Sequence, residues 1–149
     1  MKSTKNPASV MNRIGANIIE MFIISLLYGM ITALVSGNYK ALLARFESST
    51  GDYHIDITIV IILMAVYFVI VPLLWNGFTA GKFLLRTRVT KSNGENAGIK
   101  ELIIRFFVLL LPNVILLGIP AIVNVYVIAT RKDKKGYHDL LANTVVVSL

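Results

Sequence analysis

The stretch IDITIVIILMAVYFVIVPLLW at residues 55–75 decides the fold class of this chain. Its middle part, residues 57–71, contains no charged side chain. A helix that rises about 1.5 Å per residue needs roughly 20 apolar residues to cross about 30 Å of hydrocarbon, and this stretch supplies them. Tyr53 and Trp75 lie at its ends, where the aromatic belts of membrane proteins are expected. Pro72 predicts a kink near the end of this transmembrane helix.

A second membrane helix is predicted over residues 14–35, IGANIIEMFIISLLYGMITALV. The preceding Lys2 and Lys5 resemble the basic start of a signal peptide. The apolar stretch is longer than the usual signal core of about 7–15 residues, however, and it contains Glu20. We therefore predict a membrane helix that is not cleaved.

The third hydrophobic segment, residues 99–129, is too long for one ordinary crossing. Its interruptions are Arg105, Pro112, Asn113, Gly118, Pro120 and Asn124. A re-entrant segment or helical hairpin fits it better than a straight rod, because irregular backbone at membrane depth needs protein or a water-filled cavity to cover it. Asn113 and Asn124 are the helix-break candidates. Their side chains either satisfy backbone groups that the prolines free or coordinate cations, as unwound helix ends do in transporters.

The composition indicates a membrane protein with one domain. Hydrophobic residues make up 56% of the 149-residue chain and charged residues 15%, whereas a soluble domain has about 45–50% and about 25%. We assign the net charge of +7 to loops that face anionic lipid headgroups, and we expect no nucleic-acid partner. The chain has no Cys, which excludes disulfides and thiolate metal ligands.

The basic residues gather before the first helix, between the second and third hydrophobic segments, and after the third. The loop between the first two helices holds Lys40 and Arg45, offset by Glu47, Asp52 and Asp56. The positive-inside rule therefore puts the N-terminus, the middle loop and the C-tail in the cytoplasm. This requires the third segment to turn back within the membrane; the alternative is three crossings with an external tail.

Two segments outside the membrane have strand character. Residues 83–90 partly alternate and end in β-branched residues, and the turn signal of residues 92–94, SNG, predicts a short hairpin there. Residues 143–148, NTVVVS, are a candidate strand to pair with it. We expect an all-α membrane protein with a small cytoplasmic β element made by the middle loop and the C-tail.

Several polar residues fall within or beside the apolar segments. Arg13, Asn17 and Glu20 stand at i, i+4 and i+7, so they share one face of the first helix. An acid inside the apolar layer costs a few kcal/mol unless it is paired or protonated, so Glu20 is either part of a structural cluster or a functional group. Arg105 reaches either the cytoplasmic interface or Glu20. We expect Asp139 to pair with Arg13 or Arg105.

The sequence shows no motif of a catalytic or metal site. Residues 77–82, GFTAGK, lack one spacer residue of a phosphate loop and are followed by Phe83 rather than Ser or Thr. The pair His138-Asp139 offers too few metal ligands, because the other His, His54, lies in the opposite loop. No nucleophile elbow or carboxylate pair appears, so we expect no enzyme activity, no metal and no cofactor.

These residues together resemble the RDD family of bacterial membrane proteins. That family is named for an Arg before the first membrane helix, an Asp inside it, and an Asp in a C-terminal His-Asp motif. Arg13 matches the first position, and Glu20 stands where the family has its first Asp. His138-Asp139, within YHDLLANTVVV, matches the closing motif.

The middle of the chain extends the resemblance. GFTAGKFLLRTRV at residues 77–89 is similar to the family's G-x-T-P-G-K-x-L-L-x-x-x-V segment, with Ala80 in place of Pro, and Arg105 falls where the family tends to have another Arg. The resemblance implies one membrane domain over residues 1–149, in a bacterial plasma (inner) membrane. It also implies a candidate activity, because transport, including cation–proton exchange, has been proposed for members.

We therefore expect a small secondary transporter or cation/proton exchanger. Its candidate polar cluster is Arg13, Asn17, Glu20, Arg105, His138 and Asp139. Three hydrophobic segments rarely enclose a pathway alone, so we expect a homo-oligomer or a membrane partner. The alternative is a non-transporting accessory subunit, chaperone, immunity factor or scaffold, which needs only the basic face and a rigid polar cluster.

Overall fold

The computed structural model describes residues 6–37, 39–42 and 49–149. In chain order the elements are α1 (Val10–Ser36), η1 (Tyr39–Leu42), α2 (Tyr53–Ala65), η2 (Val66–Ile70), α3 (Val71–Leu74), α4 (Ala80–Leu84), β1 (Thr87–Lys91), α5 (Ile99–Ile115), α6 (Ile119–Thr130), α7 (Tyr137–Leu141) and β2 (Thr144–Ser148). The fold is thus mostly helical with a small sheet, as expected. Four of the charged residues considered above, Lys2, Lys5, Arg45 and Glu47, lie outside the described residues.

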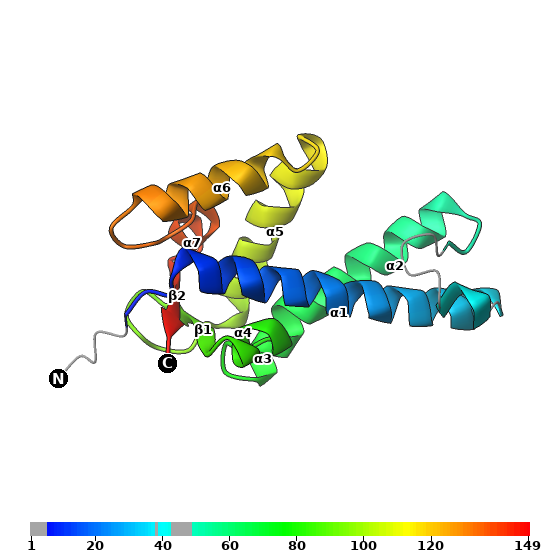
Figure 1. The fold of residues 1–149 in the computed structure, drawn as a ribbon, viewed down its shortest axis with the longest axis horizontal. Helices are drawn as coiled ribbons and strands as arrows, with labels where there is room; N and C mark the ends of the chain where they lie inside the picture. The colour runs from blue at the N-terminus through cyan, green and yellow to red at the C-terminus, as the bar shows by residue number, and fades with distance from the viewer. Residues whose placement is uncertain (1–5, 38, 43–48) are drawn as a thin grey trace.

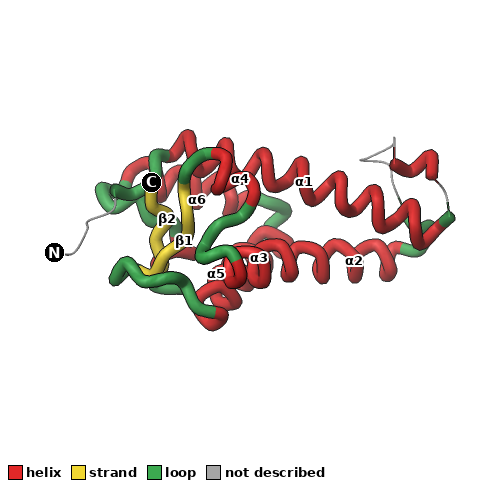
Figure 2. Tube along the Cα trace, turned by 90° about the horizontal axis from the view of Figure 1, so that it is seen from below, coloured by secondary structure: helices red, strands yellow, loops and turns green. Residues whose placement is uncertain are grey.

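Two helices are long and apolar enough to cross a membrane: α1, and the continuous helix Tyr53–Leu74 made of α2, η2 and α3. They correspond to the segments predicted at 14–35 and 55–75, each with a slightly earlier start. The two helices run side by side in opposite directions (Figures 1 and 2). Many of their large apolar side chains face outward, as lipid-facing side chains do.

Pro72 coincides with an irregular stretch of the second helix. It lies in the first turn of α3, directly after the π-helical turn η2. Proline has no N–H to donate, and its ring crowds the carbonyl four residues earlier. A wider π turn accommodates this conflict within an otherwise continuous helix.

The third hydrophobic segment is broken into two helices, as the sequence predicted. α5 ends at Ile115 and α6 begins at Ile119. Between them Leu117 and Gly118 have positive φ angles of 50° and 85°, and Pro120 follows in the first turn of α6. Gly adopts the left-handed conformation without a Cβ penalty, and Pro suits a helix start. Figure 1 shows α6 turning back from the top of α5.

The helix-break candidates Asn113 and Asn124 flank the break in the third segment rather than form it. Asn113 lies within α5 and Asn124 within α6, on either side of the true break. The Asn113 side chain donates to the Leu109 carbonyl at 2.6 Å, a contact within its own helix. The helix ends later, where Leu117-Gly118 provides the left-handed conformation that terminates helices.

The sheet joins three distant parts of the chain at one end of the molecule. β1 of the middle loop pairs antiparallel with β2 of the C-tail, in a register that sets Val89 opposite Val146. The N-terminal segment pairs with the other edge of β2: Pro7 bridges Val147, and Ala8 N donates to the Val146 carbonyl at 2.9 Å. The predicted β element of middle loop and C-tail is therefore present. Its inner face packs on Leu102 and Phe106 of α5 and on Val69 of η2.

The local hairpin predicted around residues 92–94 forms less completely. The chain does turn there, with Gly94 N donating to the Lys91 carbonyl at 2.9 Å. The returning arm makes an isolated bridge from Asn96 to Thr90 rather than a strand. Residues 83–84 belong to α4, so the strand begins only at Thr87.

Candidate functional site

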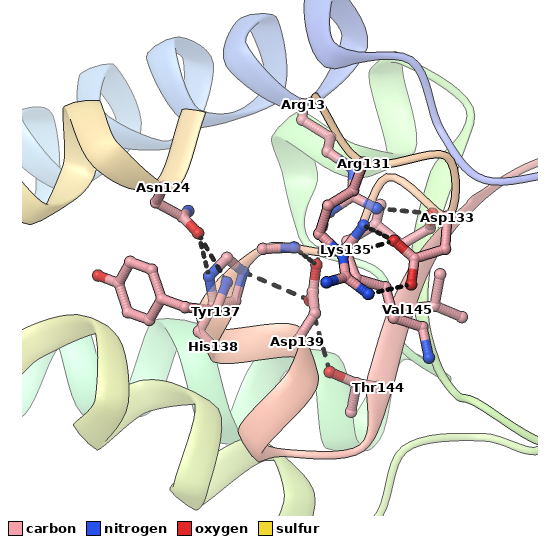
Figure 3. A network of polar contacts seen from close by, with 12 residues as sticks. Arg13, Asn124, Arg131, Asp133, Lys135, Tyr137, His138, Asp139, Thr144 and Val145 are labelled. Atoms are coloured by element: carbon pink, nitrogen blue, oxygen red, sulfur yellow. Dashed lines mark hydrogen bonds and ion pairs between the residues drawn. The ribbon is translucent and has the colours of Figure 1, made fainter. Parts of the chain in front are cut away.

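One group of buried charges lies where α1, α5 and α7 meet the sheet, and Asp139 is at its centre. It stands in the first turn of α7 with no solvent exposure. Its Oδ2 atom accepts from the backbone N–H of Gly136 at 3.1 Å, which fixes the short helix at its start. Figure 3 shows Asp139 between the α7 backbone and the Thr144 side chain of β2.

Two arginines from distant helices bind the Asp139 carboxylate. Arg13 Nη1, on α1, donates to Oδ2 at 2.6 Å, and Arg13 Nη2 donates to the Val146 carbonyl at 3.2 Å. Arg105 Nη1, on α5, donates to Oδ1 and also to Thr144 Oγ1 at 3.2 Å. We call Arg13, Arg105, His138, Asp139 and Thr144 the Asp139 cluster.

His138 completes this cluster as a neutral group. Its Nε2 lies 3.3 Å from Asp139 Oδ1, and its Nδ1 lies 3.2 Å from Asn124 Oδ1. Asn124 Oδ1 also accepts from Tyr137 N at 3.1 Å, so this α6 side chain supports the start of α7 (Figure 3). Burial, together with the positive charge of Arg105, lowers the pKa of His138 to about 3. A ring that is uncharged at neutral pH donates through one nitrogen only, so it hydrogen-bonds to either Asp139 or Asn124 and not to both.

The positive charges of the cluster determine the pKa of the Asp139 carboxylate. Burial by itself raises the pKa of Asp139, but the positive charges of Arg105 and Arg13 outweigh it. The pKa of Asp139 is consequently held well below its usual range, and the group is ionised at any physiological pH. Two guanidinium groups thus face one carboxylate.

A second cluster lies further along α1. Glu20, fully buried, accepts from Lys82 Nζ at 2.8 and 3.1 Å and from the Thr79 hydroxyl. Lys82 Nζ also reaches Thr79 Oγ1 at 3.3 Å and lies 5.9 Å from the centre of the Phe68 ring. We call Glu20, Thr79 and Lys82 the Glu20 cluster. One cation here meets one carboxylate.

Gly81 permits the close approach that the Glu20 cluster requires. A Cβ atom at this position would collide with the Ala16 carbonyl oxygen of α1 and lie 2.8 Å from Glu20 Cγ. The absent side chain lets α4 pack directly on α1 and brings Lys82 under Glu20. Burial lowers the pKa of Lys82, while Glu20 beside it acts in the opposite direction.

A third carboxylate in the same region is exposed. Asp133, in the loop between α6 and α7, accepts from Arg131 Nη2 at 2.8 Å and from Lys135 N at 3.3 Å. The hydrogen bond from Arg131 leads the causes that lower the pKa of Asp133 to about 2. Figure 3 places this surface pair beside the buried cluster, and it serves below as a matched control.

The structure brings together four of the six residues predicted to form one polar cluster: Arg13, Arg105, His138 and Asp139. Glu20 belongs to a separate cluster, and its cation is Lys82 rather than Arg105. Asn17 is exposed and belongs to neither cluster.

Lys82 and Thr79 were missed because both were assigned to the loop between membrane segments. The spacing of Thr79, Gly81 and Lys82 in GFTAGK was the signal that could have found them. Among the described residues no group of His, Asp and Glu is arranged to hold a metal ion.

These features define a class: a small helical protein with membrane-type helices, joined by buried ion pairs between its first helix, its middle segment and its C-tail. The family model described as the RDD family matches residues 7–143. The chain belongs to the RDD family. A Bacillus subtilis (strain 168) relative, the uncharacterized protein YckC, is 27% identical over 140 residues, which cover 94% of this chain and 83% of that protein. No solved structure gives a significant match.

Proposed function

We propose that this RDD-family chain is a non-transporting membrane module, an accessory subunit or scaffold whose buried charges hold its fold together. One observation supports this most: the Asp139 carboxylate is fully buried and bonded by Arg13, Arg105, Thr144 and a backbone N–H. Removing one member of such a buried pair typically costs about 3–5 kcal/mol. A group held this firmly is suited to joining helices.

A cation carrier needs a carboxylate that releases its protein partners and faces each side in turn. Asp139 has two guanidinium partners, and Glu20 has an ammonium and a hydroxyl. Neither carboxylate therefore offers a free site to a transported cation. The sequence-based expectation of a cation/proton exchanger receives no specific support from this geometry.

The membrane topology is part of the proposal. The N-terminal segment, the middle loop and the C-tail share one sheet, so they belong on the same side of the membrane, which the positive-inside rule makes the cytoplasm. α5 with 17 residues and α6 with 12 residues extend about 25 and 18 Å, less than the roughly 30 Å of hydrocarbon. The hairpin therefore enters and returns, with its apolar tip at Leu117, 92% exposed, inside the bilayer.

A scaffold of this kind works through its outer faces. Exposed Ile18, Phe22, Ile122 and Tyr126 lie on α1 and α6, and single apolar side chains of this kind face lipid or another membrane helix. A second copy of the chain or another membrane protein is the expected partner, at the plasma membrane of a bacterium.

Transport remains the second candidate, on one observation. Lys82 and Thr79, which bind Glu20, also line the cavity described below. A buried ion pair beside a cavity is an arrangement that proton-coupled carriers use. If this pair opens during a cycle, Glu20 is the coupling group.

Ion flux in proteoliposomes distinguishes the two. Purified wild type and Glu20→Gln are compared under sodium, potassium and proton gradients, with intact folding checked by circular dichroism. The scaffold proposal predicts no flux above protein-free vesicles for either protein. Flux in wild type that disappears in Glu20→Gln overturns it in favour of a carrier.

A further inference from the structure

A cavity of about 400 Å³ lies among α1, α3, α5, α6 and the sheet. Most of its wall is apolar and includes Ile14, Met64, Phe68, Leu109 and Val125. Its size falls within the range of small-molecule sites, roughly 300–1,000 Å³. The two clusters lie at its wall, so its chemistry is set by which of their atoms face inward.

The charged residues that line the cavity are, among those the structure describes, all cations: Arg13, Lys82 and Arg105. The carboxylates of Glu20 and Asp139 lie fully buried behind them. With His138 neutral, three cations meet two carboxylates. The cavity wall therefore has an excess of one positive charge, located in the Asp139 cluster.

The arginines have donors left for a further acceptor. Arg13, 7% exposed, has a buried Nε with no hydrogen-bond partner among the described residues. Arg105 makes its described hydrogen bonds through Nη1 alone. Unpaired guanidinium donors beside excess positive charge are suited to bind a further anion.

The cavity extends along α1 from the Asp139 cluster to the level of the neutral Glu20–Lys82 pair. Met21, which also lines it, is eight residues beyond Arg13, about 12 Å further along the helix. Met21, Ala121 and Val125 are exposed as well as lining the cavity, so it opens sideways between α1 and α6. On the proposed topology this opening faces the lipid of the cytoplasmic leaflet.

We infer that the cavity binds an anionic phospholipid, with the headgroup phosphate at Arg13 and Arg105 and one acyl chain along the apolar wall. Charge complementarity selects the anion, and the lateral opening between apolar helices selects a lipid from the bilayer over an anion from water. The inference does not depend on whether the protein transports ions.

Native mass spectrometry of the detergent-purified chain, titrated with phosphatidylglycerol or phosphatidylcholine, tests the inference. We expect phosphatidylglycerol to bind at least about tenfold more tightly, the factor that one charge-assisted contact typically gives. Millimolar inorganic phosphate should not displace it. Equal affinity for the two lipids overturns the inference, and full displacement by phosphate replaces it with a site for a soluble anion.

Two variants test whether the lipid binds in this cavity. Arg105→Lys retains a cation for Asp139 but removes the spare guanidinium donors, and Ala121→Trp fills the mouth of the cavity while leaving both clusters intact. Each variant should reduce the preference for phosphatidylglycerol over phosphatidylcholine about tenfold. Lys132→Gln, at an exposed position, should leave that preference unchanged. Unchanged preference in both folded variants, or an equal loss in Lys132→Gln, assigns the lipid to the general basic surface and contradicts the inference.

Discussion

The Asp139 cluster and the Glu20 cluster are both buried, yet their charges are balanced differently. Asp139 meets two arginines from α1 and α5 and lies on α7, so it joins three segments far apart in the chain. Glu20 meets one lysine and joins only α1 to α4. The first cluster sets the tertiary arrangement and has positive charge to spare, whereas the second is a neutral pair that closes a local contact.

The described part of the chain buries few apolar side chains, and the Asp139 cluster explains how α1, α5 and the C-tail are nevertheless held in a defined arrangement at the sheet end of the molecule. The hydrophobic effect contributes little to the association of helices that already lie in lipid, so close packing and polar contacts determine how they associate. The Asp139 cluster supplies those contacts where α1, α5 and the C-tail meet. Near the outer ends of α1 and α2, the half-buried Asp56 carboxylate accepts from Ser49 and Thr50 rather than from a buried cation.

The largest expected effect is that of Asp139→Asn. Both arginines then stay buried without a carboxylate, so we expect a loss of about 3–5 kcal/mol in the free energy of unfolding, or failure to accumulate as folded protein. Thermal unfolding in detergent measures it. Asp133→Asn, which removes the exposed carboxylate of the neighbouring loop, is the control and should cost under about 1 kcal/mol. Similar losses for the two would remove the distinction drawn between the buried and exposed pairs.

Glu20→Gln should have a smaller effect, about 2 kcal/mol, because it leaves a single cation unpaired and keeps a hydrogen-bonding group in place. The double variant Glu20→Gln with Lys82→Met should recover part of that loss, since no unpaired charge stays buried. Chemical unfolding of the single and double variants gives the coupling. Strictly additive losses would show that the two side chains do not interact.

The smallest effect concerns pH. The pKa of His138 is about 3 in the folded chain and about 6.5 when unfolded. Between these values the unfolded state binds a proton that the folded state does not, so stability is lost as the pH falls. We expect a loss of about 1 kcal/mol between about pH 7 and pH 5.5, and His138→Gln should abolish it. Asp139 contributes a further loss only below about pH 4, where its unfolded form begins to protonate. A variant with the wild-type pH dependence would mean that His138 is not the group responsible.

The sequence predicted the membrane-type helices, the break in the third segment, and the pairing of the C-tail strand with the middle loop. It also predicted that Arg13, Arg105, His138 and Asp139 belong together. These features follow from apolar length, proline and glycine positions, charge, and the RDD resemblance.

Sequence reasoning failed where three-dimensional packing determines which side chains meet and where a helix ends. Glu20 pairs with Lys82 because Gly81 lets α4 approach α1, a contact that no spacing along α1 reveals. The helix-break candidates Asn113 and Asn124 flank the break, and both fit within helices. The break needed a left-handed residue pair, and Gly118 followed by Pro120 was the better signal.

The central claim is that the C-tail returns to the side of the N-terminus, because Asp139 cannot otherwise meet Arg13. The chain has no Cys, so single cysteines at Asn93, Lys132 and Ser49 can be labelled with a membrane-impermeant maleimide, from outside in spheroplasts and from inside in inverted vesicles. The account predicts that positions 93 and 132 label from the cytoplasmic face and position 49 from the opposite face. Labelling of positions 93 and 132 from opposite faces would contradict it.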